Sequence, residues 1–337
     1  MYRRKKYLLI ALCLFIAERA FSQCCTLGDP FISDAEQPAL QSKILTASLA
    51  YRYSHSGKYY SDDSRFTELP FQEIAYSNYT ELQVGYGITN WLTVMTDLGY
   101  FFNKTLTTPG IDSYKGYGLG DLGLYAKFNA FSSSRLKLTL SPTIGVKFPT
   151  GVFDQEVDNV QLPISVQPSA GSYCYLANLF VSKGFRKIAL AGFASYEYSQ
   201  LIQSENFYYK YGDQWIAALY FNYRPWKRVT IDLQVRNEYR SKSNRENEEI
   251  VEASGYEVVF FTPQLSYAFK HDWYVSAYAD IPMYKYYNGI QMSFGYALSF
   301  RVTKKIDFIA LKARHSANQS NKSELGVNME LSNELKQ

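Results

Sequence analysis

Apolar and polar side chains alternate with a period of two residues along most of this chain. The clearest segment has one apolar and one polar face, made respectively by Val229, Ile231, Leu233 and Val235 and by Thr230, Asp232, Gln234, Arg236, Glu238 and Arg240. The same alternation recurs in residues 121–128 and 136–148. Because successive side chains of a β-strand point to opposite faces, this pattern predicts strands with one face against an apolar medium and one against water.

Twelve such strands are predicted, and their connections alternate in length. The strands occupy residues 44–54, 79–88, 91–102, 118–130, 135–149, 172–182, 187–199, 213–224, 228–240, 255–269, 272–284 and 290–302. Tight turns at 89–90, 131–134, 183–186, 225–227 and 270–271 alternate with long connections at 55–78, 103–117, 150–171, 200–212 and 241–254. Short turns at one end and long loops at the other are typical of outer-membrane barrels, whose short turns face the periplasm. The predicted fold is therefore all-β, a transmembrane antiparallel up-and-down β-barrel over residues 44–302.

The C-terminal tail, residues 303–337, leaves the strand count open. Residues 306–313 and the alternating Leu325, Val327, Met329 and Leu331 fit one more hairpin, so the barrel has 12 strands, or 14 if the tail adds this hairpin. Two prolines, Pro142 and Pro263, interrupt predicted strands. Since proline cannot donate a ladder hydrogen bond, each is expected at a bulge or at an end of the barrel.

The first 22 residues are predicted to be a signal peptide, which places the mature protein in the cell outer membrane after secretion and cleavage. Basic residues precede an apolar run from Tyr7 to Ala17, and small residues lie at Ala20 and Ser22. That run has 11 residues, against about 20 in a membrane-spanning helix. Residues 23–43 would then form an N-terminal periplasmic segment or a plug, and the barrel-assembly machinery is an expected partner during biogenesis.

Composition and charge agree with a barrel. The chain has 31 Tyr and 22 Phe at a mean hydropathy of −0.25, a combination that follows when strands face lipid on one side and aromatic girdles flank them. Trp91, Trp226 and Trp273 lie beside short turns and Trp215 follows a long loop, which predicts an aromatic belt at each interface. The alternative is that these tryptophans are core residues of a soluble β protein. Without the signal peptide the chain has 30 basic and 30 acidic residues, so no nucleic-acid partner is expected.

Four short motifs resemble an outer-membrane family named for the meta-cleavage pathway of phenol degradation. They are GITNWLTV at 87–94, GLGDL at 118–122, KFPTG at 147–151 and PMYKYYNGIQ at 282–291. The resemblance covers about residues 40–300 and implies a transport barrel, with small hydrophobic or aromatic cargo as the substrate class. The chain departs from the family at QPSAGS, residues 167–172, where a more glycine-rich turn is usual.

The polar faces of the strands predict the residues that line the pore. These are Glu81, Asp97, Asp121, Tyr125, Lys127, Lys137, Lys147, Glu197, Tyr220, Asp232, Arg236, Glu238, Arg240, Tyr278, Asp280 and Arg301. The set mixes both signs of charge, whereas an ion-selective pore has a one-sided ring. Opposite charges on neighbouring strands are therefore expected to pair across the interior, with the alternative of an interior that is packed shut.

No catalytic residue, metal site or cofactor is predicted, so the protein is not expected to be an enzyme. The only histidines, His55, His271 and His315, fall in loops, turns or the tail, away from a serine that they could activate. Three cysteines remain after processing, and a disulfide between Cys174 and Cys24 or Cys25 would pin the N-terminal segment inside the barrel. Unpaired or vicinal cysteines explain the same count.

Two functions follow from these observations. The first is an outer-membrane channel or transporter for small hydrophobic or aromatic compounds, with outer-membrane lipid and a small-molecule cargo as its partners. The second is a non-transporting barrel that acts as an anchor or binding protein, for which the tyrosine-rich loops around Tyr59, Tyr60, Tyr208, Tyr209 and Tyr211 are the support.

Overall fold

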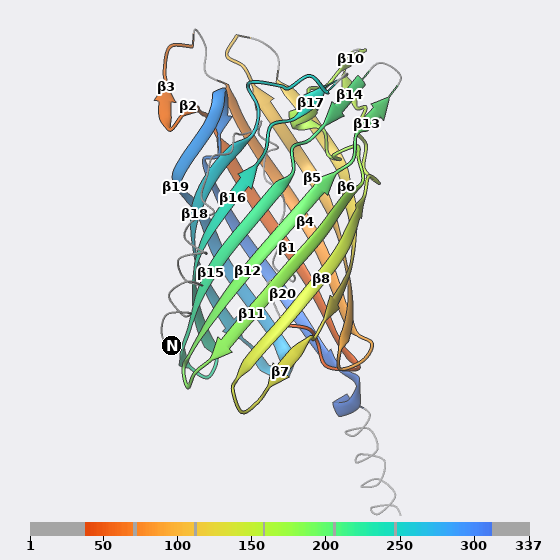
Figure 1. Ribbon diagram of the computed structural model, residues 1–337, viewed down its shortest axis with the longest axis vertical. Coiled ribbons are helices and arrows are strands. Elements are labelled where there is room, and N and C mark those ends of the chain that lie inside the picture. The colour runs from red at the N-terminus through yellow and green to blue at the C-terminus, as the bar shows by residue number, and fades with distance from the viewer. Residues whose placement is uncertain are drawn as a thin grey trace, which may run out of the picture.

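Twelve antiparallel strands close into a barrel, as predicted (Figure 1). The computed structural model describes residues 38–69, 73–110, 113–157, 159–204, 207–245 and 248–311. The wall consists of β1 (Ile44–Ser56), β4 (Ile74–Gly87), β5 (Leu92–Thr107), β6 (Tyr114–Phe128), β8 (Leu138–Phe148), β11 (Cys174–Gly184), β12 (Ile188–Ser199), β15 (Gln214–Trp226), β16 (Val229–Arg240), β18 (Tyr256–Ala268), β19 (Trp273–Ser293) and β20 (Tyr296–Asp307). Each strand pairs with the next in the chain, and β1 pairs with β20 to close the ring.

The 14-strand alternative is wrong, because the ring has no free edge for another hairpin. β1 is paired on one side with β4 and on the other with β20. The strand that was predicted to begin at Ile306 is instead the end of β20, which continues to Asp307, and residues 308–311 are helical. Residues 312–337 lie outside the described part of the chain, as do the predicted signal peptide and residues 23–37.

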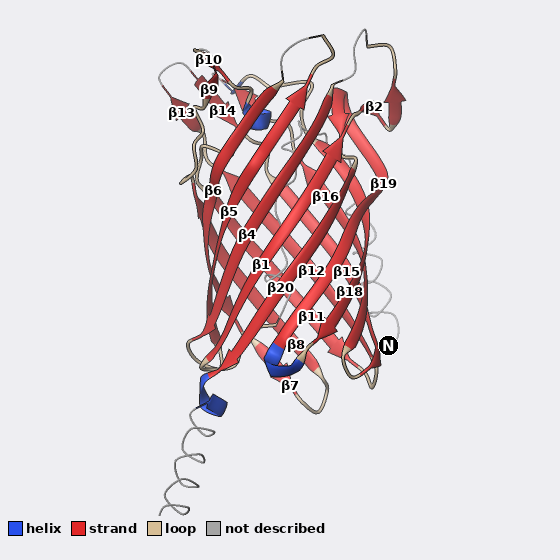
Figure 2. Cartoon of the chain, turned by 180° about the vertical axis from the view of Figure 1, so that it is seen from behind, coloured by secondary structure: helices blue, strands red, loops and turns tan. Residues whose placement is uncertain are grey.

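The two ends of the barrel differ as the connection lengths predicted (Figures 1 and 2). The long connections form small additional elements, which are β2 (Lys58–Asp62), β3 (Ser64–Phe66), β9 (Glu156–Val157), β10 (Val160–Gln161), η1 (Ile164–Val166), β13 (Ile202–Ser204), β14 (Phe207–Lys210) and β17 (Asn244–Arg245). The short-turn end has only β7 (Phe131–Ser133), η3 (Lys270–Asp272) and the helical residues 308–311 among the described residues. By the rule for outer-membrane barrels the short-turn end is periplasmic and the long-loop end extracellular.

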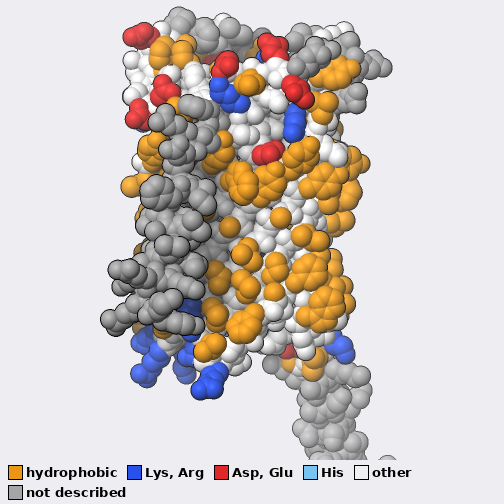
Figure 3. All heavy atoms as spheres, in the orientation of Figure 1, with side chains coloured by type: hydrophobic (Ala, Val, Ile, Leu, Met, Phe, Trp, Pro, Cys, Tyr) orange, Lys and Arg blue, Asp and Glu red, His pale blue; other side chains and the backbone are white. Residues whose placement is uncertain are grey.

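The outer surface of the barrel is an apolar band (Figure 3). Strand after strand presents an outward-facing aliphatic side chain, such as Leu49 at 56% exposure, Ile144 at 58% and Leu219 at 71%. Exposed tryptophans flank this band, with Trp91, Trp226 and Trp273 at the periplasmic end and Trp215 at the extracellular end. Aliphatic side chains that remain exposed in a folded chain require a lipid environment, so the protein is a barrel of the outer membrane. Among the described residues, no helix has the length and apolar character needed to span a membrane.

Both prolines lie where one ladder is interrupted, and neither lies at a bulge. Pro142 pairs with Leu179, while on its other side the ladder to β6 ends at Thr143 and the ladder to β7 begins at Leu140. Pro263 pairs with Leu233 of β16, but the ladder to β19 skips it. Each proline therefore lies at a position where the ladder needs no backbone N–H donor.

Candidate functional site

The interior of the barrel is the candidate site, and its strands bring most of the predicted pore residues there. Lys137 is the exception. It lies in the periplasmic turn, exposed and with a φ of 50°, because β8 begins at Leu138 rather than at residue 135. The predicted set omitted inward-facing cations, among them Arg52 in β1 and Lys104 in β5.

Asp280 is the centre of the first ion-pair cluster in the lumen. Its carboxylate is 2% exposed and accepts hydrogen bonds from Arg52 Nη1 at 2.6 Å and Thr262 Oγ1 at 2.5 Å. Arg236 Nη2 lies 3.4 Å from the same carboxylate, and Arg236 Nε lies 2.7 Å from Glu238. These residues come from β1, β16, β18 and β19. In the ring, β18, β19 and β20 lie between β16 and β1, so one buried carboxylate links strands that are not neighbours.

A second cluster surrounds Glu197 of β12. Lys147 Nζ of β8 lies 2.8 Å from its carboxylate, and Arg240 Nη2 of β16 lies 3.7 Å away. Arg240 also donates to Gln214 Oε1 of β15 at 2.8 Å. Opposite charges thus pair inside the barrel as expected. Because each cation of these two clusters has an anion beside it, neither cluster presents a one-sided ring of charge to a permeating ion.

The connection between β8 and β11, residues 149–173, covers part of the extracellular mouth and is fixed by two inward-facing side chains. Lys104 Nζ donates to the carbonyl oxygen of Gln167 at 2.9 Å. Asp121 accepts from Ser169 Oγ at 2.5 Å and from the backbone N–H of Ala170 at 3.0 Å. Asp121 therefore holds this loop rather than lining an open passage.

Gln167 organises the same loop from within. Its side chain is 1% exposed, donates to the carbonyl oxygens of Gln155 and Leu162, and accepts from the N–H of Gln155. The segment in which the chain departs from the resembled family thus has a defined conformation, made by one glutamine that satisfies several backbone groups. We name residues 149–173 the mouth loop.

The interior also contains three apolar clusters, at different heights. The loop cluster, at the extracellular mouth, consists of Ile202, Tyr209 and Tyr211, packed against Phe153, Ile164, Ala170 and Val251. The upper cluster consists of Tyr256, Val258, Phe260 and Tyr287. The middle cluster consists of Phe180, Phe193, Ile216 and Ala218 on β11, β12 and β15. Burial raises the pKa of Tyr211 well above its ordinary value, so this phenol stays neutral.

Two inward-facing tyrosines lie flat against the wall because glycines leave room for their rings. A Cβ atom on Gly145 would lie 2.2 Å from Cδ1 of Tyr125, and one on Gly99 would lie 1.8 Å from the hydroxyl of Tyr79. The glycine positions therefore set how far these rings reach into the lumen.

Gly145→Ala is expected to lower the free energy of unfolding by about 1–3 kcal/mol, because the new methyl group overlaps the Tyr125 ring. The temperature at which the folded, fast-migrating form disappears from a gel measures this. Gly192→Ala is the matched control, since its Cβ would meet Val181 Cγ1 at an ordinary 3.4 Å. Equal stability of the two variants would show that Tyr125 is free to move aside.

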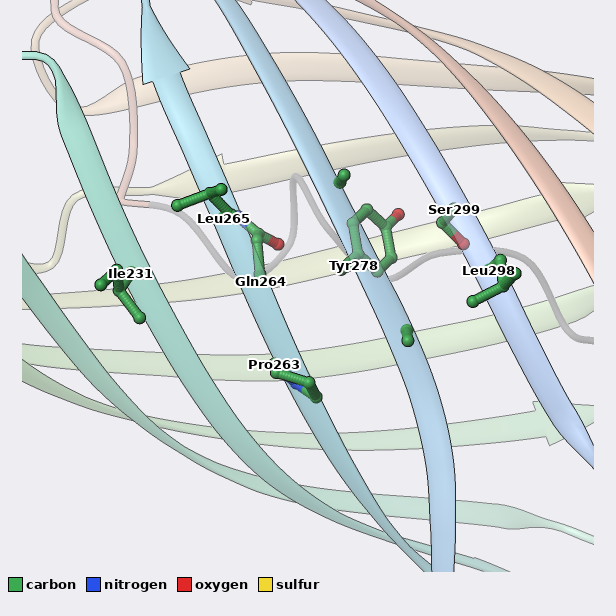
Figure 4. Close-up of a pocket in the computed structure, with 9 residues that line it drawn as sticks. Ile231, Pro263, Gln264, Leu265, Tyr278, Leu298 and Ser299 are labelled. Atoms are coloured by element: carbon green, nitrogen blue, oxygen red, sulfur yellow. The ribbon is translucent and has the colours of Figure 1, made fainter.

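The lipid-facing wall has an apolar pocket of about 520 Å³ where the β18–β19 ladder is interrupted (Figure 4). Outward-facing side chains that include Pro263, Leu265 and Leu298 line it, and the inward-facing Gln264 and Tyr278 back it. The pocket therefore opens toward lipid, and the side chains that back it face the lumen.

Cys174 and the histidines have ordinary structural surroundings. Cys174 is a buried free thiol whose Sγ lies 3.4 Å from Ser199 Oγ. Cys24 and Cys25 lie outside the described residues, so the disulfide stays a prediction. His55 stacks on Tyr296 and His271 is exposed in a periplasmic turn, while His315 is also outside the described chain.

The comparisons with known proteins agree with the barrel. No family model matches the chain. No curated protein matches it either. Among solved structures, the COG4313 outer membrane channel from Pseudomonas putida F1 is similar with a TM-score of 0.65 at 14% identity, over 83% of this chain and 100% of that one. The NanC porin has a TM-score of 0.41 at 11% identity, over 75% and 97% of the two chains. A FadL homologue from Pseudomonas aeruginosa has a TM-score of 0.41 at 10% identity, over 79% and 90%. The first of these likenesses establishes that the chain has the fold of an outer-membrane channel.

Proposed function

We propose that this barrel is a passive outer-membrane channel for small hydrophobic or aromatic compounds. The observation that carries the proposal is the series of apolar clusters inside the barrel, from the loop cluster through the upper cluster to the middle cluster. A pore for hydrophilic solutes is lined by polar groups and water. Buried inward-facing phenylalanines instead offer an apolar solute a surface that stabilises it by about 25 cal/mol per Å² removed from water.

The paired charges support the same cargo class. A small ion that enters must compete with Lys147 for Glu197, or with Arg52 for Asp280, and these contacts are 2.6 to 2.8 Å long. An uncharged apolar molecule need not break them, because it passes along the clusters between the ion pairs. The family resemblance of the sequence motifs implies the same cargo class.

Four of the five tyrosines that favoured an anchoring or binding barrel make contacts within the protein. Tyr209 and Tyr211 are buried in the loop cluster, and Tyr60 packs against Tyr287 at a ring-centroid distance of 6.3 Å. Tyr59 donates its hydroxyl to Glu73 at 2.6 Å. Side chains committed to such contacts are not presented to a partner, so the structure favours transport over binding.

Phe193→Asn is expected to reduce entry of a small aromatic compound about tenfold, because it replaces an apolar contact worth about 1.5–3 kcal/mol in the middle cluster. The measurement is the initial rate of accumulation of a radiolabelled monoaromatic compound in cells that depend on this barrel for its entry. Phe193→Leu is the control and should stay near the wild-type rate.

Liposome swelling with a small sugar measures the entry of a hydrophilic solute through the same variants. The wild-type barrel should pass sugar poorly, and Phe193→Asn should pass it no more slowly. An unchanged rate of entry of the aromatic compound in Phe193→Asn would show that its path does not pass the middle cluster. A wild-type barrel that passed neither class of solute would favour the anchoring function.

A further inference from the structure

The periplasmic end of the barrel is strongly basic. Four consecutive turns around the ring carry seven exposed basic side chains, which we name the basic rim: Arg135, Lys137, Arg186, Lys187, Lys227, Arg228 and Lys270. The same turns contain one described carboxylate, Asp272. Figure 3 shows Lys and Arg side chains gathered at this end, whereas the other end has Asp and Glu side chains together with a few Lys and Arg.

Three of these four turns also carry an exposed aromatic residue directly before their basic residues, at the edge of the apolar band. Phe185 precedes Arg186 and Lys187, Trp226 precedes Lys227 and Arg228, and Phe269 precedes Lys270; their exposures are 53%, 69% and 53%. Aromatic rings of this kind lie at the level of the lipid headgroups. The neighbouring lysine and arginine side chains therefore place their charged groups at or just beyond the level of the lipid phosphates, because their aliphatic portions are long and flexible.

Nothing in the described protein neutralises the basic rim. The ion pairs of the structure lie in the lumen, apart from Lys242 with Glu252 in an extracellular loop, and none includes a rim residue. The neighbouring Lys304 shows the geometry that is available there, because its Nζ lies 5.1 Å from the centre of the Trp273 ring. A row of unneutralised cations beside a lipid-facing aromatic belt is complementary to anionic headgroups.

We propose that the basic rim binds the phosphate groups of anionic phospholipids in the periplasmic leaflet of the outer membrane. The ligand is a lipid such as phosphatidylglycerol, held by its acyl chains against the apolar band and by its phosphate against the arginines and lysines. Each basic residue near such a surface adds to the attraction. The exposed extracellular carboxylates Asp62, Asp63, Glu248 and Glu249 give the opposite end no such affinity.

The test uses the purified processed barrel in a zwitterionic detergent, titrated with phosphatidylglycerol or phosphatidylcholine, with retained lipid counted by native mass spectrometry. The rim variant carries Arg186→Gln, Lys187→Gln, Lys227→Gln and Arg228→Gln. The control variant removes four charges from the extracellular end by Lys58→Gln, Arg65→Gln, Lys115→Gln and Arg245→Gln, all exposed positions. Gel migration without heating confirms that each variant is folded.

The wild type and the control variant should retain phosphatidylglycerol in preference to phosphatidylcholine, and the rim variant should bind it about tenfold more weakly, with less dependence on salt. Equal retention of both lipids by the wild type, or undiminished phosphatidylglycerol binding by the rim variant, would overturn the proposal. Inorganic phosphate is the competitor that tests the source of the phosphate. Displacement of the lipid at equal phosphate concentration would show a free-phosphate site in place of a lipid surface.

Discussion

Asp280→Ala is expected to lower the free energy of unfolding by about 3–5 kcal/mol, because it removes a buried carboxylate that accepts from Arg52 and lies beside Arg236. Asp280 is 2% exposed, and the side chains of Arg52 and Arg236 are 12% and 13% exposed. The substitution also removes the acceptor of Thr262 Oγ1. The temperature at which the folded form is lost on a gel should fall strongly, and urea unfolding in lipid vesicles gives the free-energy difference.

The extracellular pair of Lys242 and Glu252 provides the control. Glu252 is 79% exposed, so Glu252→Ala should change stability by no more than about 1 kcal/mol. Adding Arg52→Leu to Asp280→Ala should restore part of the loss, because the cation that faced the lost carboxylate at 2.6 Å is then removed as well. A loss under about 1 kcal/mol for Asp280→Ala would mean that Asp280 is not the main stabiliser of these arginines, and that Glu238 or water takes this role.

The alternation of polar and apolar residues was sufficient to predict the wall. A lipid-facing strand has little freedom in which side chain it turns outward, so the twelve strands, their order and the inward face of β16 follow directly from the sequence. The ends of the strands are less constrained. Lys137 was assigned to the lumen because Leu136 and Leu138 continue the alternation, but its left-handed backbone ends the pattern before the strand begins.

Two contacts could not be predicted because they depend on partners distant in the chain. The predicted strands end at residue 284 and resume at 290, and the Asn-Gly pair at 288–289 is a common turn signal, yet β19 continues to Ser293. Its last residues pair with β2 from the first extracellular loop, and Gly289 takes a φ of +59° to allow the register shift. Pairing with a remote strand thus overrides the local turn signal.

Lys104 shows the same limit inside the candidate site. Period-two counting from Asp97 places residue 104 on the lipid face. A register shift in the β5–β6 ladder between Phe101 and Lys104 places an extra residue on β5 and so reverses which positions face inward. Only the structure shows that this lysine points inward to the mouth loop. Arg52 did have a signal, since it alternates with the small inward residues Ser48, Ala50 and Ser54.

Releasing the mouth loop is expected to raise single-channel conductance about threefold or more. Asp121→Ala removes the two hydrogen bonds to Ser169 and Ala170, and Gln167→Ala removes three more within the loop. Each such bond contributes about 0.5–1.5 kcal/mol, or about 1.5–3 kcal/mol where the acceptor is charged. The double variant therefore loses several kcal/mol of the free energy that favours the closed position, enough to shift the loop population by more than about a hundredfold. Asp154→Ala changes an exposed carboxylate of the same loop and should leave conductance unchanged.

The two solute classes should respond to this double variant in opposite directions. Phe153, Ile164 and Ala170 belong to the mouth loop and complete the loop cluster around Tyr211. When the loop moves, the passage for water and sugar widens, but the first apolar surface that a hydrophobic solute meets is dismantled. Liposome swelling with sugar should therefore accelerate while accumulation of the aromatic compound slows. Parallel increases for both solutes would show that the loop only obstructs the mouth, and unchanged conductance would place the narrowest point deeper, at the Glu197 and Asp280 clusters.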